Sequence, residues 1–162
     1  MSRPWYALAE EQEHEAFLKG LEQFNAGDYY AAHDTWEEIW QDLDGRRATF
    51  YRVLIQTAVI HVLMQNRQGA GVRAVFRTVK DMLRELPERH RGIDLARLGR
   101  DLTAAVDWIV SRPPGVWREV AKRTAEGEAI MFDAERVFQI PLLYDPFVDP
   151  RSNDVEADSP RE

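Results

Sequence analysis

The chain has 162 residues, 44% of them hydrophobic, which is enough to build the core of one domain without a metal or a disulfide. It contains no cysteine, which excludes disulfides, thiolate zinc sites, iron–sulfur clusters and cysteine nucleophiles and favours a cytoplasmic location. The formal net charge of −7 argues against broad contact with a nucleic-acid backbone, so we expect no nucleic-acid partner.

The charged residues have an unusual composition, because only three of the 21 basic residues are lysines. Few lysines and a surplus of aspartate and glutamate are typical of acidic proteins from salt-adapted cells. A GC-rich genome also favours arginine codons, so the composition is compatible with either origin. The N-terminus lacks the basic start and apolar run of a secretion signal. The longest apolar stretch, 53–64, is shorter than the roughly 20 residues of a membrane span, and we expect no membrane contact.

Hydrophobic residues at helical spacing predict three helices in the first 66 residues. The first covers 9–25 and is followed by Gly27, a typical residue after a helix C-terminus. Asp28 is expected to cap a second helix, which continues to about residue 43 and ends in the turn 42–47 with Gly45 as the breaker. A third helix over 48–66 is apolar nearly all round, which places it at the centre of a bundle.

Two amphipathic helices are expected after this central helix. One runs over 72–83 and is followed by Pro87, and the stretch 87–94 is expected to be a loop. The other is capped by Asp94, covers 95–109, and ends before Pro113 and Pro114.

The expected architecture is therefore an all-α antiparallel bundle of about five helices that forms one domain over 1–112, since short connections favour antiparallel neighbours. Residues 113–150 are apolar, aromatic and broken by prolines, apart from a stretch that suits a short helix. We expect an irregular C-terminal arm here, packed on the bundle or on a neighbouring subunit, and a homo-oligomer formed through it. Residues 151–162 are polar and are expected to be a disordered tail.

A polar group stands out on the second expected helix. At 100° per residue His33 and Glu37 lie one turn apart beside the apolar stripe, whereas Asp34 and Glu38 are expected on the opposite side. If this helix packs antiparallel to the third, His61 converges with His33 and Glu37. The expected cluster, buried or lining a cleft, comprises Tyr29, His33, Glu37, Trp40, Arg52, Gln56 and His61.

Two interpretations of this cluster stay open. In the first, His33, Glu37 and His61 ligate a divalent metal and leave positions open for water. In the second, Glu37 accepts hydrogen bonds from an imidazole, a tryptophan indole or Arg52, and the network only fixes the register of the helices. The sequence favours the second interpretation, with protein interaction as the function, because the His–Glu spacing is unspecific.

No pattern of residues predicts catalysis. The four serines lie at termini or in loops without a paired base, which argues against serine hydrolase chemistry. His14, among glutamates, and His90, in a basic loop, are both expected to be in contact with solvent. The protein is therefore more readily interpreted as a binding or structural module than as an enzyme.

Residues 24–75 resemble a prokaryotic family called domain of unknown function 309. Its signature matches Phe24, Asn25, Gly27, Tyr29, His33, Glu37, Trp40, Leu54, Ile55, Gln56, Ala58, His61, Gly69 and Ala70. Asp34 stands where the family usually has glutamate, and Val53 where glycine is common. The resemblance, which extends loosely over 24–86, implies an up-and-down three-helix core with extra helices and implies no activity.

Overall fold

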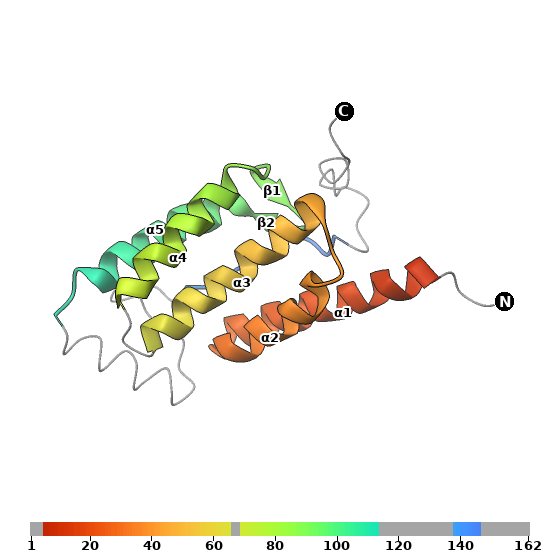
Figure 1. The fold of residues 1–162 in the computed structure, drawn as a ribbon, viewed down its shortest axis with the longest axis horizontal. Helices are drawn as coiled ribbons and strands as arrows, with labels where there is room; N and C mark the ends of the chain where they lie inside the picture. The colour runs from red at the N-terminus through yellow and green to blue at the C-terminus, as the bar shows by residue number, and fades with distance from the viewer. Residues whose placement is uncertain (1–4, 66–68, 114–137, 147–162) are drawn as a thin grey trace.

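The computed structural model describes residues 5–65, 69–113 and 138–146, and it confirms the predicted all-α bundle (Figure 1). A hairpin with strands of two residues each precedes the last of the five helices in these described residues. The elements are α1 (Trp5–Asn25), α2 (Tyr29–Trp40), α3 (Gly45–Gln65), α4 (Gly69–Leu83), β1 (Arg89–His90), β2 (Ile93–Asp94) and α5 (Leu95–Val110). None of the described helices combines the length and the apolar character needed to cross a membrane.

The central position predicted for the third helix is confirmed. α3 lies between the α1–α2 pair and the α4–α5 pair, and each helix packs against the one that follows it (Figure 1). Because neighbours cover it on both sides, α3 is buried along most of its length, including Phe50, Leu54 and Ile60. The polar residues Thr57 and His61 are buried with them.

The predicted helix caps are present. Gly27 follows α1 with a φ of 89°, a conformation that costs glycine little. Asp28 then caps α2 by accepting a hydrogen bond from the Ala31 amide at 3.3 Å. Asp94 caps α5 in the same way, from the Arg97 amide at 2.9 Å. The Asp28 cap fixes where α2 begins, and the start of the helix sets the orientation of its polar residues.

α3 begins three residues earlier than predicted. Gly45 was expected to break the chain between helices, but it is the first residue of α3 and has a φ of 62°. The positive φ reverses the chain at this single residue, so the helix can start directly after the turn. The Ala48 amide donates to the Asp44 carbonyl at 3.3 Å.

The stretch 87–94, expected to be a loop, contains the short antiparallel hairpin of β1 and β2. Its two turn residues, Arg91 and Gly92, have φ values of 49° and 77°, as a tight type I′ hairpin turn requires. The Leu143 amide donates to the Gly92 carbonyl at 2.7 Å, which ties the hairpin to the C-terminal segment.

Residues 138–146 of the predicted arm lie against the bundle. Phe138 and Ile140 are buried, and the Asn25 side chain bonds both backbone groups of Ile140, at 2.8 and 3.0 Å. The short helix and the disordered tail predicted for other parts of the C-terminus lie outside the described residues.

Candidate functional site

The polar residues of α2 lie at the edge of its buried face. Tyr29, Ala32 and Trp36 form that face and are buried. His33 follows Ala32 by one residue, which rotates it by 100° toward solvent, and its side chain is 26% exposed. Glu37, one turn further on, is 42% exposed. This part of the predicted cluster is therefore open to solvent.

His33, Asp34 and Glu37 form what we call the α2 polar group. Nδ1 of His33 lies 3.0 Å from Oδ1 of Asp34, and Nε2 lies 3.3 Å from Oε2 of Glu37. One ligand atom of each residue can be chosen so that all three lie within 4.8 Å of one another. Asp34 is exposed, as expected for the side away from the core, but its short side chain also contacts the neighbouring imidazole.

An imidazole placed between two carboxylates can donate from both nitrogens only in its protonated form. The α2 polar group thus places one imidazole between two carboxylates. A divalent cation could replace a proton on one nitrogen, with the carboxylates supplying the oxygen ligands.

An exposed aromatic ring lies beside this group. Tyr30 is 65% exposed, and its ring centroid is 6.2 Å from that of His33. Large aromatic side chains usually bury most of their surface. Together with the α2 polar group, Tyr30 gives the outer face of α2 an aromatic and acidic character.

His61 is in a different environment from His33. Its ring is fully buried among Phe24, Tyr29 and Phe138, at centroid distances of 5.0, 4.6 and 4.7 Å. The structure pairs His33 with Glu37, and within the described residues it gives His61 no hydrogen bond or ion pair to either. Helical periodicity assigned each residue to a face but could not show how far α2 and α3 are rotated about their axes.

His61 acts as an aromatic core residue in this position. Nδ1 donates to the Thr57 carbonyl at 2.7 Å, so Nε2 carries the lone pair, and Nε2 has no hydrogen-bond partner in the described structure. Burial lowers the pKa of His61 from 6.5 to about 4, only partly opposed by the bond to Thr57. The ring is therefore neutral near pH 7.

The other predicted members of the cluster are dispersed. Arg52 is exposed on α3, and Gln56 and Trp40 are half-buried. None of the bonds proposed from Arg52 or an indole to Glu37 is found in the described structure; the Trp36 indole donates instead to the Phe17 carbonyl, at 3.4 Å. The α2 polar group is thus what the structure retains of the predicted site, with Asp34 added.

A buried ionic cluster at Glu13 was missed by the sequence analysis. The side chain of Glu13 is only 4% exposed and pairs with both Arg47 and Arg91, the latter at 3.1 Å. The Tyr51 hydroxyl donates to it at 2.9 Å. Glu13 precedes Phe17 by four residues on the buried stripe of α1, a spacing that could have revealed it.

The Glu13 cluster joins α1, α3 and the hairpin turn. Burial, reinforced by the neighbouring Glu13 carboxylate, raises the pKa of the Tyr51 phenol well above its ordinary value of 10. The phenol therefore stays protonated and remains a donor to Glu13. This arrangement satisfies a buried charge and holds three elements together, which is a structural role.

Two histidines expected in solvent are not fully exposed. His90 is buried, with its ring 4.7 Å from that of Phe50, because the hairpin folds it under the end of α3. His14 is half-buried, and its Nε2 lies 3.0 Å from Oδ2 of Asp145 on the C-terminal segment. Both corrections arise from contacts distant in sequence, which periodicity does not report.

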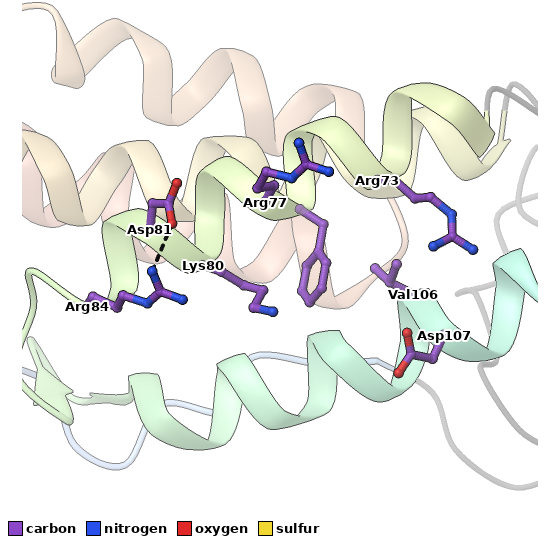
Figure 2. A pocket seen from close by; sticks show the side chains of 8 residues that line it. Arg73, Arg77, Lys80, Asp81, Arg84, Val106 and Asp107 are labelled. Atoms are coloured by element: carbon purple, nitrogen blue, oxygen red, sulfur yellow. Dashed lines mark hydrogen bonds and ion pairs between the residues drawn. The ribbon is translucent and has the colours of Figure 1, made fainter.

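A charged hollow of about 230 Å³ lies between α4 and α5, and we call it the α4–α5 groove (Figure 2). Its lining combines four cations, two carboxylates and two apolar side chains. These residues are Arg73, Phe76, Arg77, Lys80, Asp81, Arg84, Val106 and Asp107.

Comparison with known proteins adds a family assignment. No curated protein matches the chain. The model of the family described as "Domain of unknown function (DUF309)" matches residues 17–75, which include the α2 polar group and His61. Residues 17–75 are therefore similar to a DUF309 domain, whose function is unknown.

Proposed function

We propose that this protein is a binding module that recognises another macromolecule through the outer face of α2. The observation that carries the proposal is the exposure of Tyr30 beside the α2 polar group. Tyrosines at the centre of protein interfaces often contribute much of the binding energy, because they bury a large area with few rotatable bonds. Because most of the Tyr30 side chain is exposed, it contributes little to the core of the isolated bundle.

The same face indicates the chemistry of the partner. Asp34 and Glu37 place negative charge beside His33, and Asp34 and Glu38 are exposed. An arginine side chain can stack on a tyrosine ring and donate two hydrogen bonds to a carboxylate. A basic segment of a partner protein therefore suits this face better than an acidic or apolar one.

The signature stated above supports a role for these positions beyond folding. Several of its positions have a clear structural role here: Phe24 and His61 are buried in the core, and Gly27 forms a turn. His33 and Glu37 reach solvent and contact each other, and exposed ion pairs of this kind contribute little to stability. A family pattern that includes them favours a binding function.

The test is site-specific photo-crosslinking in the cells that make this protein. A benzophenone amino acid replaces Tyr30 in one strain and the exposed Glu22 of α1 in the other. We expect a discrete adduct from position 30 that is lost when Glu37→Lys is added. Equal adducts from both positions, or none from position 30, would contradict the proposal.

Divalent-cation binding by the α2 polar group is a second candidate, favoured by three ligand atoms within 4.8 Å. Titration calorimetry of metal-free protein with zinc or manganese chloride tests it. We expect binding that is lost in His33→Ala and retained in His14→Ala, which removes an imidazole elsewhere. No heat above dilution with either metal would exclude this candidate.

A further inference from the structure

The α4–α5 groove carries a local excess of positive charge on an acidic chain. Arg73, Arg77 and Lys80 lie on α4 and Arg84 directly follows it, at intervals of four, three and four residues. Residues at this spacing lie along one side of a helix, and the stripe is about 16 Å long at 1.5 Å per residue. The chain as a whole has a net charge of −7, so this stripe is an exception to its surroundings.

Two of these four cations form no ion pair or ring contact within the described part of the chain. Arg84 pairs with Asp81 at 3.2 Å, and both are largely exposed (Figure 2). Lys80 lies over the Phe76 ring at 5.4 Å from its centroid. In the described part of the chain, no carboxylate pairs with Arg73 or Arg77, and both are exposed. Their charges are therefore available to a ligand.

The floor and the far wall of the groove restrict the kind of ligand. Phe76 and Val106 supply apolar surface, and Asp107 of α5 faces the groove across from the α4 cations (Figure 2). Asp81 and Asp107 repel any anionic ligand, and a nucleic-acid backbone would gain little from the apolar floor to offset this repulsion. A polypeptide with mainly acidic and some apolar side chains can bind both the four cations and the apolar floor of the groove.

We propose that the α4–α5 groove binds an acidic amphipathic helix of a partner protein. Glutamates or aspartates at intervals of three and four residues on that helix repeat at the spacing of the cations on α4. An apolar side chain between them packs on Phe76 and Val106, in the manner of a helix docked in a groove between two others. This site is separate from the outer face of α2.

Fluorescence anisotropy tests the proposal with a labelled synthetic helix of about 18 residues, long enough to cover the stripe. The peptide carries glutamates at positions i, i+4, i+7 and i+11 with leucines beside them, and a matched peptide carries glutamines instead. We expect the glutamate peptide to bind the full-length protein at least about tenfold more tightly than the glutamine peptide, and less tightly as salt increases.

The protein variants are matched for charge. Arg77→Glu lies in the groove, and Arg100→Glu makes the same change at an exposed position of α5 outside it. We expect Arg77→Glu to weaken binding about tenfold, Arg100→Glu to leave it within about twofold, and Asp107→Asn to strengthen it. Arg77→Gln, which only removes the charge, should give an intermediate loss, and circular dichroism verifies that each variant folds.

Three outcomes would overturn the proposal. Equal losses in Arg77→Glu and Arg100→Glu would mean that only net charge matters. A labelled oligouridylate that binds as tightly as the glutamate peptide, and is also weakened by Arg77→Glu, would assign the groove to nucleic acid. A dimer in sedimentation velocity that Arg77→Glu dissociates would assign it to a second copy of the chain. None of these depends on crosslinking at Tyr30.

Discussion

Glu13 is a buried ionisable residue on which the stability of the bundle depends. Its carboxylate pairs with Arg47 and Arg91 and accepts a hydrogen bond from Tyr51. Glu13→Ala leaves two guanidinium groups and a buried phenol without that acceptor. Removing one partner of a buried pair typically costs about 3–5 kcal/mol, and we expect a loss near the lower value because Arg47 is partly exposed. Urea unfolding monitored by tryptophan fluorescence measures it.

Glu15 provides the control for this substitution, because it is exposed on the same helix. Glu15→Ala should change the free energy of unfolding by less than about 0.5 kcal/mol. Glu13→Gln keeps the acceptor oxygen and removes the charge, so its loss should lie between the other two. A loss below about 1 kcal/mol in Glu13→Ala would show that the arginines find water instead, and that the cluster does not hold the elements together.

Because the pKa of His61 is lowered in the folded protein, we expect the free energy of unfolding to depend on pH. Its pKa is about 4 in the folded protein, against an ordinary value of 6.5 in the unfolded chain. Between these two values the unfolded chain binds a proton that the folded chain excludes. The contribution of His61 is therefore fully present above pH 6.5 and is lost as the pH falls toward about 4. The total loss is on the order of 3 kcal/mol, at about 1.4 kcal/mol per pH unit.

The measurement is urea unfolding at a series of pH values for the wild type and for His61→Phe. Groups other than His61 also titrate in acid, but they are common to both proteins. The free-energy difference between the two proteins should change by on the order of 3 kcal/mol from pH 6.5 to about 4. Parallel curves would indicate that water reaches the ring and that His61 is not confined as the structure shows.

At the scale of elements, the crossing of α1 and α2 depends on Gly20. A Cβ atom built at this glycine would lie 2.1 Å from Nε1 of Trp36, whose indole is fully buried. Alanine is the better helix former by about 1 kcal/mol, but here the two helices would have to separate. We expect Gly20→Ala to destabilise the protein by about 1–3 kcal/mol. The midpoint of urea unfolding reports the change.

Gly99 is the matched control, because it is also a helical glycine. A Cβ atom there would lie 3.3 Å from the end of the flexible Leu83 side chain, which can move slightly. Gly99→Ala should therefore remain within about 1 kcal/mol of the wild type. If both variants behave alike, the close packing of Trp36 on Gly20 is not what sets the distance between α1 and α2.

The elements that the sequence predicts well are those determined by local chemistry. The caps at Asp28 and Asp94 and the apolar surface of α3 depend on residues a few positions apart, and all were predicted. The hairpin at 87–94 was not predicted, because its strands have only two residues each and too short a pattern to detect. Its docking, through His90 and Gly92, depends on contacts with distant segments.

At the scale of the whole molecule, the same distinction applies to the candidate site. The pairing of His33 with Glu37 follows from their spacing on one helix and was predicted. Whether His61 joins them depends on the rotation of α3 relative to α2 and on Phe138, which lies 77 positions further along the chain. Periodicity within single helices gives neither the rotation of α3 relative to α2 nor the position of Phe138. The Glu13 cluster was missed for the same reason, since its residues come from three separate segments: α1, α3 and the hairpin turn.

The C-terminal segment completes the core, and this gives a prediction for the whole molecule. Phe138 packs on His61 and Phe24 at centroid distances of 4.7 and 5.9 Å and is buried. Phe138→Ala should cost about 3–5 kcal/mol and admit water to the imidazole. Because burial is the main cause of its low pKa, the pKa of His61 should then rise from about 4 toward 6.5.

Two-dimensional NMR of the histidine ring protons follows this pKa in each variant that remains folded. Leu143→Ala, in the same segment at a residue 48% exposed, is the control and should leave both stability and the His61 titration unchanged. A loss of stability in Phe138→Ala without a change in the His61 pKa would mean that Phe138 only adds apolar area. A rise of the pKa together with the loss would show that a segment more than 70 residues away in the sequence keeps this histidine neutral, and hence a core residue.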